Sequence, residues 1–326
     1  MHKRKGIFGI LTIIFCLFTL CACESAIPPL DEIRVFDGFS VHYLDVGQGD
    51  AIFIRLPDGK NMLIDCGDKD ADGENAEYII EYLNKYSVDN IDYLILTHPD
   101  SDHVGNADEI LGRFDVGTAF IPFITDEMQT LFPEFSSAKE KLEEKEVLIV
   151  NPDCFQYLKG ENYFFAFLSP TPRSFPDSSY SELASSSVPT ATQINNLSPI
   201  TYLECFGKRF VFTGDAESAE ESKVVSNYKS GFYGLAYQTA GYSINLENVD
   251  CLKISHHGAS DASSKEFLQL LNTKNAVISV GDNFYGHPSS ETLIKLEEVN
   301  ADYSLFRTDV DGTISARLNG QSLVID

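Results

Sequence analysis

Apolar and polar residues alternate in short runs over the part of the chain that follows residue 38. The runs cover residues 39–46, 51–56 and 61–65, and turn-forming sequences such as Gly47-Gln48-Gly49-Asp50 separate them. Alternation with a period of two residues is typical of a strand with one buried face. Residues 75–86 change to helical spacing, with apolar Ala76, Ile79, Ile80 and Leu83. The sequence therefore predicts three strands followed by an amphipathic helix.

Strand and helix patterns then alternate to the end of the chain. Further strands are predicted at residues 91–97, 117–121, 199–206, 210–213, from 249 onward, at 276–280 and in closing runs through 325. Further helices are predicted to end near residue 113 and to cover residues 138–145, 216–228, 264–271 and 291–299. Each half begins with strands and continues with alternating helices and strands, so we expect an internally duplicated, layered α/β structure.

Two segments depart from this pattern. Residues 169–198 are rich in Ser and Pro and poor in charge, and we interpret them as a long surface excursion, either a disordered loop or a rim over the site. Residues 229–248 contain Gly and Tyr and form an insertion between two regular segments.

The first residues indicate export. Residues 1–22 contain a basic start and an apolar run from Gly6 to Ala22, which is shorter than the roughly 20 residues that span a bilayer comfortably. The end of this run, Leu20-Cys21-Ala22-Cys23, resembles the lipobox of bacterial lipoproteins, in which the last cysteine is lipidated. We therefore predict a signal peptide (1–22), a tether (23–38) and a hydrolase domain (39–326). A lipid at Cys23 is expected to anchor the protein to the outer face of the cell membrane.

Charge and cysteine content narrow the function classes. The chain carries 24 Lys and Arg against 49 Asp and Glu, and removal of residues 1–22 takes away three basic residues and no acid. Such a surface repels polyanions unless a local patch or bound metal ions reverse the field. The cysteines that remain besides Cys23 are Cys66, Cys154, Cys205 and Cys251. They form no Cys-x-x-Cys pair, so a thiolate metal site or a redox motif is not expected.

Histidines and aspartates gather where predicted strands end. His98-Pro99-Asp100-Ser101-Asp102-His103 follows one strand, Asp215 follows another, and His256-His257 follows a third, while His287 lies in a later turn. Imidazole and carboxylate groups at strand ends favour one convergent metal site. A polar loop in which Asp102 caps the next helix is the alternative.

Six motifs occur in the same order as in the metallo-β-lactamase superfamily, and the chain resembles most narrowly the soluble domain of ComEC-type competence proteins. The motifs are Leu44-Asp45-Val46-Gly47-Gln48-Gly49-Asp50-Ala51, Leu63-Ile64-Asp65-Cys66-Gly67, Leu96-Thr97-His98-Pro99-Asp100-Ser101-Asp102-His103, Phe212-Thr213-Gly214-Asp215, Ser255-His256-His257-Gly258 and Tyr285-Gly286-His287-Pro288. The resemblance implies a four-layer αβ/βα sandwich and a metal-dependent hydrolase, with nuclease activity proposed for this branch.

The resemblance also implies a ligand set. One metal ion is expected to bind His98 and Asp100, and a second to bind Asp102, His103 and His256. Asp215 is expected to bridge the two ions, which share a hydroxide nucleophile. Asp65 is expected to orient a ligating histidine from behind, or else to cap a turn at a strand end. Asp102, Asp215 and His287 are the residues predicted to act in catalysis.

The chain departs from the family pattern at three places. The superfamily usually has histidine where Asp100 stands, and the harder oxygen ligand shifts the expected preference from Zn toward Mn or Mg. The superfamily also has a histidine about 20 residues before the bridging aspartate, where this chain has Asn195 or Asn196, so one ion is expected to bind weakly. Ala259 stands where the ComEC pattern continues with serine.

Several further residues are expected near the site. His287 is a candidate general acid or phosphate clamp, because an imidazole titrates near neutral pH, or it is a histidine that stabilises a turn. Asp45, Gln48 and Asp50 lie on a glycine-rich loop that the family places beside the site, although simple turn formation explains them as well. His257 is expected to lie behind the ligands or to contact substrate.

These observations lead to one predicted function and two alternatives. We predict an exported metallohydrolase that binds one or two Mn, Zn or Mg ions and cleaves phosphodiesters, with DNA as the leading substrate. The first alternative is hydrolysis of a small or neutral substrate, such as an ester, an amide or a small phosphodiester. The second is a non-catalytic DNA-uptake accessory. No Gly-rich nucleotide-binding loop is present, so no nucleotide cofactor is expected.

Overall fold

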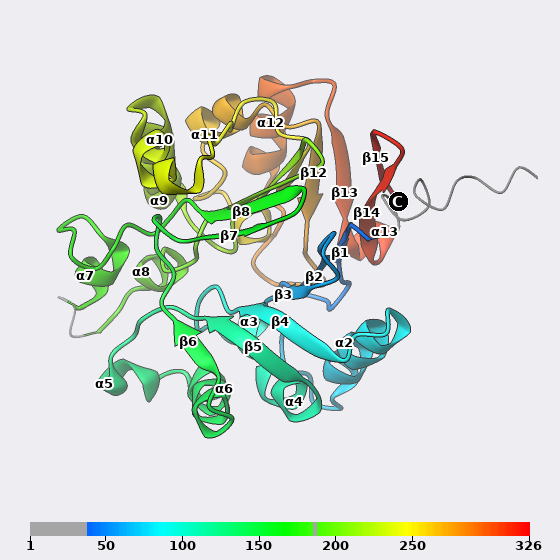
Figure 1. Cartoon of the computed structure of the whole chain (residues 1–326), viewed down its shortest axis with the longest axis vertical. Helices are drawn as coiled ribbons and strands as arrows, with labels where there is room; N and C mark the ends of the chain where they lie inside the picture. Colours follow the sequence, from blue (N-terminus) through cyan, green and yellow to red (C-terminus); the bar gives the residue numbers. More distant parts are fainter. Residues whose placement is uncertain (1–37, 185–187) are drawn as a thin grey trace, which may run out of the picture.

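The computed structural model describes residues 38–184 and 188–326, and its elements form layers stacked one on another (Figure 1). The predicted signal peptide, Cys23 and all of the predicted tether except residue 38 lie outside the described residues. Within the described ranges, no helix combines the length and apolarity needed to cross a lipid bilayer.

One sheet contains eight strands in the order β15-β14-β1-β2-β3-β4-β5-β6. Their bounds are β1 Ser40–Tyr43, β2 Ile52–Arg55, β3 Asn61–Ile64, β4 Asn90–Ile95, β5 Asp115–Phe120, β6 Leu148–Val150, β14 Ile314–Asn319 and β15 Ser322–Ile325. The pairs β1-β2 and β2-β3 are antiparallel, whereas β3, β4, β5 and β6 run parallel. β14 comes from the end of the chain and pairs with β1.

The other sheet contains seven strands in the order β13-β12-β11-β10-β9-β8-β7. Their bounds are β7 Tyr157–Gly160, β8 Tyr163–Phe167, β9 Thr201–Cys205, β10 Lys208–Phe212, β11 Cys251–Lys253, β12 Asn275–Ile278 and β13 Ser304–Arg307. Strands β7 to β10 are antiparallel, and β10 to β13 are parallel. Both sheets therefore change from antiparallel to parallel pairing, as the duplicated sequence pattern predicts.

Helices cover the outer face of each sheet (Figure 1). Those of the first half are α2 Glu74–Lys85, α3 Ser101–Val104, α4 Ala107–Arg113, α5 Asp126–Gln129 and α6 Pro133–Glu144. Those of the second half are α7 Ser179–Ala184, α8 Ala191–Asn195, α9 Ser218–Lys229, α10 Phe232–Ala236, η1 Gln238–Ala240, η2 Ser255–Gly258, α11 Lys265–Leu271, α12 Ser290–Val299 and α13 Thr308–Asp311.

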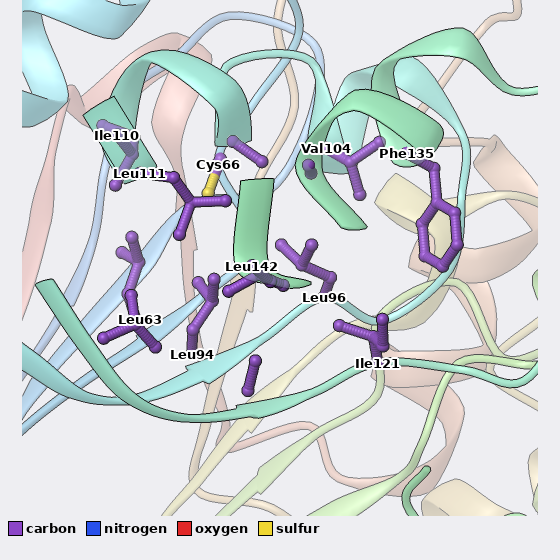
Figure 2. Close-up of a cluster of buried hydrophobic side chains, with 14 of the residues drawn as sticks. Leu63, Cys66, Leu94, Leu96, Val104, Ile110, Leu111, Ile121, Phe135 and Leu142 are labelled. Atoms are coloured by element: carbon purple, nitrogen blue, oxygen red, sulfur yellow. The ribbon is translucent and has the colours of Figure 1, made fainter. Parts of the chain in front are cut away.

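Three buried clusters fill the spaces between these layers. Leu63 and Leu94 of the first sheet, and Leu96 directly after β4, pack against helix residues such as Leu111 and Leu142 (Figure 2). A second cluster lies between the other sheet and helices α9 to α12. The third lies between the two sheets. Because β10 directs its residues alternately to two faces, Phe210 and Phe212 join the cluster between the sheets and Val211 joins the helix-side cluster. The predicted four-layer αβ/βα sandwich is confirmed.

The described part of the Ser/Pro-rich segment, residues 169–184 and 188–198, contains helices that its composition does not indicate. It contains α7 and α8, and it buries Tyr180, Leu183, Ile194 and Leu197 in the core of the first half. Thr190 begins α8 with a capping box, in which its side chain accepts from the Gln193 backbone N–H. Of the two predicted alternatives, the described part of this segment corresponds to a rim and not to a disordered loop.

The polar motifs emerge from the carboxyl ends of adjacent strands. Asp65 follows β3, the His98–His103 loop follows β4, Asp215 follows β10, and His256-His257 follow β11. Since β3-β4 and β10-β11 are parallel pairs, their carboxyl ends lie at one edge of each sheet. The fold therefore brings these motifs from both halves of the chain to one place.

Candidate metal centre

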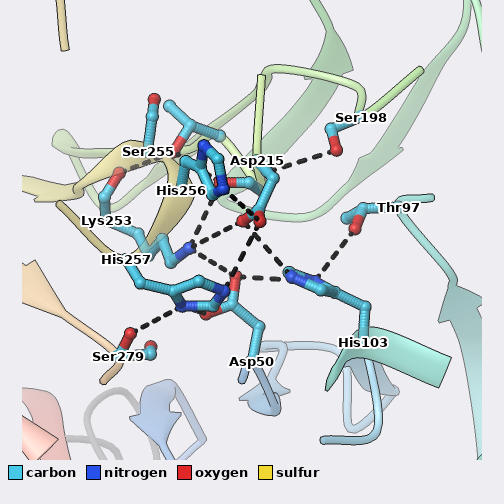
Figure 3. Close-up of polar contacts among 12 residues, drawn as sticks. Asp50, Thr97, His103, Ser198, Asp215, Lys253, Ser255, His256, His257 and Ser279 are labelled. Atoms are coloured by element: carbon cyan, nitrogen blue, oxygen red, sulfur yellow. Dashed lines mark hydrogen bonds and ion pairs between the residues drawn. The ribbon is translucent and has the colours of Figure 1, made fainter. Parts of the chain in front are cut away.

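Asp215 lies at the centre of the polar cluster (Figure 3). Its Oδ1 is 3.3 Å from Nε2 of His103, and its Oδ2 is 3.4 Å from Nε2 of His257 and 4.0 Å from Nε2 of His98. The backbone N–H of Asp215 donates to the Ser198 hydroxyl at 3.2 Å. One carboxylate thus faces histidines from both halves of the molecule, which is the arrangement that a bridging ligand requires.

His103 is held from behind by Asp65. The carboxylate of Asp65 accepts from Nδ1 of His103 at 2.8 Å, and from the backbone N–H and hydroxyl of Thr97 at 2.7 Å each. All three residues are buried. With Nδ1 bound by Asp65, Nε2 is directed at Asp215 and can bind a metal ion once it has lost its own proton. Asp65 thus occupies the supporting position that the sequence predicts for it.

His98 and Asp100 lie beside Asp215 but outside the tightest group. Nε2 of His98 is 3.6 Å from Oδ2 of Asp100. His98 is fully buried, with Nδ1 3.2 Å from the hydroxyl of Ser198, whereas the Asp100 side chain is partly exposed. Asp100 stands at the start of α3 without making a side-chain cap bond, so its carboxylate is free to bind another group.

His257 supplies the second histidine of the central group. Its Nδ1 donates to the backbone carbonyl of Ser279 at 2.8 Å, which directs Nε2 toward Asp215 and toward Oδ2 of Asp102, 3.2 Å away. Asp102, His103, Asp215 and His257 each offer a ligand atom, and these atoms all lie within 4.8 Å of one another.

The structure differs from the sequence-based ligand set at His256. Its Nε2 is 3.8 Å from Asp215, and its Nδ1 faces Asp261 at 3.4 Å, so His256 groups with Glu217 and Asp261 instead. Both His256 and His257 have positive φ, 47° and 50°. Two consecutive left-handed residues end the strand alternation, and the turn directs His257 inward and His256 toward the cavity wall.

Lys253 is a buried residue that the sequence analysis missed. It lies on β11 with no exposed surface, and its ammonium forms an ion pair with Asp50. It also donates to the carbonyl of Gly214 at 3.2 Å and lies 3.9 Å from Oδ1 of Asp215. A lysine within an otherwise apolar strand indicates a buried ion pair, because a buried ammonium requires a charged or polar partner. That partner, however, lies about 200 positions earlier in the sequence.

Asp50 reaches this position because the loop that carries it packs very closely on α3. A Cβ atom on Gly49 would lie 2.3 Å from the carbonyl oxygen of Asp102, and Gly49 has φ +136°. The backbone N–H of Asp50 donates to the same carbonyl at 3.1 Å. Of the residues predicted near the site on this loop, Asp50 is buried beside the cluster, Gln48 lines the cavity, and Asp45 is exposed and accepts from Gly47 in a turn.

Asn195 and Asn196 hold Glu217. The Asn195 amide donates to Oε1 of Glu217 at 2.9 Å, and the Asn196 side-chain oxygen accepts from the Glu217 backbone N–H at 2.9 Å. Both asparagines are buried, and Asn195 also lines the cavity. They therefore stabilise the wall of the site at the place where the family pattern has a histidine.

Charges in the cluster shift several pKa values. Burial alone would lower the pKa of His257, but the carboxylates of Asp215 and Asp102 outweigh it and raise the pKa to about 10. The pKa of His103 is raised for the same reason, with Asp215 and Asp65 as its charged neighbours. Burial would raise the pKa of Asp215, yet the charges of His257 and His103 hold it well below its usual value.

His287 has a different environment. Burial lowers its pKa, and the nearby charges of His256 and His257 lower it further. Its ring lies 5.3 Å from that of His256, and its Nδ1 is buried without a hydrogen-bond partner. A histidine that is neutral at pH 7 suits hydrogen bonding or proton transfer better than it suits a charged phosphate clamp.

The donor atoms fit divalent metal ions. Nε2 of His98, His103 and His257 and Oδ1 of Asp215 are buried, and none makes a hydrogen bond. Four such atoms facing one another are costly unless a cation satisfies them. They line or border a cavity of about 480 Å³ that opens between the His98–His103 loop and the 281–287 loop. The residues present therefore fit the binding of divalent metal ions, as the sequence predicts.

Comparisons with known proteins find relatives that are much longer than this chain. The chain is 28% identical over 293 residues to "ComE operon protein 3" of Bacillus subtilis (strain 168), a match that covers 85% of this chain and 33% of the relative. It is 24% identical over 271 residues to "Competence protein ComA" of Neisseria gonorrhoeae, covering 83% and 31%. The chain thus spans about a third of the length of these curated relatives.

A solved structure and a family description complete the comparison. The metallo-beta-lactamase fold protein YhfI from Bacillus subtilis matches with a TM-score of 0.46 and 11% identity, covering 84% of this chain and 98% of YhfI. The description "Metallo-beta-lactamase superfamily" matches residues 44–282, which include five of the six motifs, from Leu44 to Gly258. The chain therefore belongs to the metallo-beta-lactamase superfamily of metal-dependent hydrolases.

Proposed function

We propose that this protein is a metal-dependent phosphodiesterase that acts on nucleic acid, with its metal ligands drawn from both halves of the fold. The observation that carries the proposal is the position of Asp215, whose two carboxylate oxygens face Nε2 atoms of His103 and His257 at 3.3 and 3.4 Å. The relative named "Competence protein ComA" supports a nucleic-acid substrate. When bound, divalent ions polarise the phosphoryl group and activate water for in-line attack.

The proposed ligands follow the geometry of the cluster. Asp102, His103 and His257 would hold one ion, His98 and Asp100 would hold another, and Asp215 would contact both. His257 thus takes the place that the sequence analysis gave to His256. Because Asp65 and the Ser279 carbonyl each bind a histidine Nδ1, both imidazoles keep their Nε2 atoms available. Asp100 adds oxygen to the set and favours Mn or Mg beside Zn.

The residues around the ligands position the substrate and move its protons. His287 lines the cavity and is proposed to donate a proton or a hydrogen bond to the leaving oxygen. His256 lies between Asp215 and Asp261, where its ring can contact a phosphoryl oxygen. The predicted export signal and the lipid at Cys23 remain part of the proposal and would place this activity outside the cell.

The test uses protein from residue 24 onward, stripped of metal and reloaded with Mn, Zn or Mg. It is incubated with single- and double-stranded DNA beside Asp215→Ala, and the exposed Asp302→Ala serves as a matched control. Metal-dependent cleavage that Asp215→Ala loses and Asp302→Ala keeps is the expected result. Absence of cleavage of either DNA, with metal content verified by elemental analysis, contradicts the nucleic-acid proposal.

A second candidate function is hydrolysis of a small, uncharged ester or amide. The acidic surface favours it, because the chain has a formal net charge of −25. Aryl ester substrates added to the same metal series distinguish the two functions. Ester cleavage that depends on Asp215, without cleavage of any phosphodiester, assigns this second function.

A further inference from the structure

Two aromatic side chains project into solvent beside the candidate metal centre. Phe284 is fully exposed and Tyr285 is 77% exposed, although large aromatic rings are usually at least half buried. Both residues lie on the 281–287 loop between β12 and α12, and both line the cavity that contains Asp102, Asp215 and His257. Two unburied rings at the mouth of a site require an explanation other than packing.

Hydrogen bonds of Asn283 hold the backbone of this loop in place. The side-chain oxygen of Asn283 accepts from the backbone N–H groups of Tyr285, Gly286 and His287 at 3.1, 2.9 and 3.0 Å. Its amide donates to the carbonyls of Gly281 and His287 at 2.9 Å each. The Tyr285 ring also stacks on His287, with the ring centres 5.7 Å apart. The backbone that carries both rings, and the Tyr285 ring itself, are therefore preorganised, which lowers the entropy cost of binding a ligand.

The loop is also anchored to the opposite half of the molecule. Gly281 packs on the glycine-rich loop so closely that a Cβ atom would lie 2.4 Å from the Gln48 backbone nitrogen. The Gly281 N–H points toward the Gln48 side-chain oxygen at 3.4 Å. The loop that carries the aromatic residues is thus anchored beside ligands contributed by both halves.

The charge of the cavity limits what can bind there. None of the described residues that line it is lysine or arginine, and its acidic residues are Asp68, Asp100, Asp102, Asp215 and Asp282. Proteins that bind duplex nucleic acid contact many phosphates with basic side chains. This cavity can bind few phosphates, namely those that metal ions neutralise. Its remaining affinity must come from uncharged contacts such as ring stacking.

We infer that the 281–287 loop is a stacking surface for an unpaired nucleobase next to the scissile phosphodiester. The substrate is accordingly a dinucleotide or a single-stranded end, and not a duplex. This inference rests on the proposed phosphodiesterase function and specifies its substrate class. Duplex bases hide their faces within the helix, whereas unpaired bases expose them for stacking on aromatic side chains.

A binding measurement tests the inference without turnover. The probe is a dinucleotide that contains 2-aminopurine and has a bridging CH₂ group in place of the scissile oxygen, so it cannot be hydrolysed there. Stacking quenches 2-aminopurine fluorescence, and the protein contains no Trp that would interfere. We expect saturable quenching by the Mn-loaded wild-type protein. Absence of quenching overturns the inference.

Variants separate stacking from general apolar contact. Phe284→Leu keeps an apolar side chain and loses the ring, so we expect affinity for the probe to fall on the order of tenfold. Phe284→Tyr keeps an aromatic ring without introducing a Trp, so it should retain the wild-type affinity. Phe155→Ala is the matched control, because it removes a partly exposed ring that does not line the cavity. Equal affinity of Phe284→Leu and wild type overturns the inference.

Competition and hydrolysis complete the experiment. Unlabelled single-stranded dinucleotide should displace the probe, and covalently closed duplex DNA at equal nucleotide concentration should not; equal displacement overturns the inference. Hydrolysis of bis(p-nitrophenyl) phosphate reports the proposed function separately. Hydrolysis without quenching overturns the stacking surface alone. Quenching without hydrolysis of any phosphodiester supports the stacking surface and overturns only the proposed function.

Discussion

The two halves of the molecule hold the histidines that face Asp215 by different means. In the first half, a buried carboxylate, Asp65, binds Nδ1 of His103 and also fixes Thr97. In the second half, a backbone carbonyl, that of Ser279, binds Nδ1 of His257. Both hydrogen bonds direct the Nε2 atom of a histidine toward Asp215. Only the bond to Asp65 adds a negative charge, and only that bond can be removed by mutation of one side chain. The bond to Ser279 uses a backbone carbonyl, so no substitution of a side chain removes its acceptor.

The ion pair between Lys253 and Asp50 joins the two halves, and its loss should have the largest effect. Lys253→Met leaves a carboxylate buried without its cation, so we expect the free energy of unfolding to fall by about 3 to 5 kcal/mol. Urea denaturation followed by circular dichroism measures it. The double variant Asp50→Asn with Lys253→Met should recover most of the loss. A single variant as stable as wild type shows that the pair does not support the junction.

Separate substitution of His256 and His257 tests which of the two adjacent histidines binds the metal ion. His257→Ala should weaken metal binding more than about a hundredfold. This loss exceeds the roughly 10- to 100-fold loss expected when a residue that only supports a ligand is removed. His256→Ala should weaken it less than about tenfold, because His256 faces Asp261. Competition with a chromophoric chelator measures both. The reverse order of effects would restore the assignment made from the sequence.

Asp65→Asn tests the carboxylate support of the first half. The amide can still occupy the space, but it loses the charge that holds His103 in the required tautomer. We expect metal affinity to fall about 10- to 100-fold with little change in fold. Thr97→Val, which removes only the hydroxyl that donates to Asp65, is the milder comparison and should lose less. If the two variants lose equally, the charge of Asp65 is not what matters.

A change of pH should alter metal affinity less than these substitutions do. His257 must lose its proton to bind a metal ion, and its pKa is raised to about 10. Metal affinity should therefore rise with pH, about tenfold per unit for each proton released, up to that pKa. Calorimetric titration in buffers of different ionisation enthalpy counts the protons. Binding that releases no proton at pH 7 contradicts the raised pKa.

The same shift predicts the opposite slope for the metal-free protein. Protonated His257 is stabilised by Asp215 and Asp102, so its contribution to stability is fully present below pH 6.5 and is lost as the pH rises toward 10. Thermal unfolding between these values should show that contribution decline without metal. With metal bound, stability should rise over the same range.

The sequence predicted the layers and the location of the site, because strand alternation and polar strand ends are local signals. It could not separate His256 from His257, since alternation ends at Ile254 and two left-handed residues follow. It also missed Lys253, whose role depends on Asp50 in the other half. The order in segment 169–198 depends on Tyr180 and Leu183 reaching the first core, a long-range contact that composition does not encode.

The pairing of β1 with β14 has a consequence for how the chain folds. β1 begins at Ser40, and its second neighbour in the sheet, β14, does not begin until Ile314. Until the last residues have been synthesised, β1 is an edge strand with one row of unpaired backbone groups. Closing a contact of this sequence separation is slow. The N-terminal sheet is therefore finished last, although most of its strands are made first.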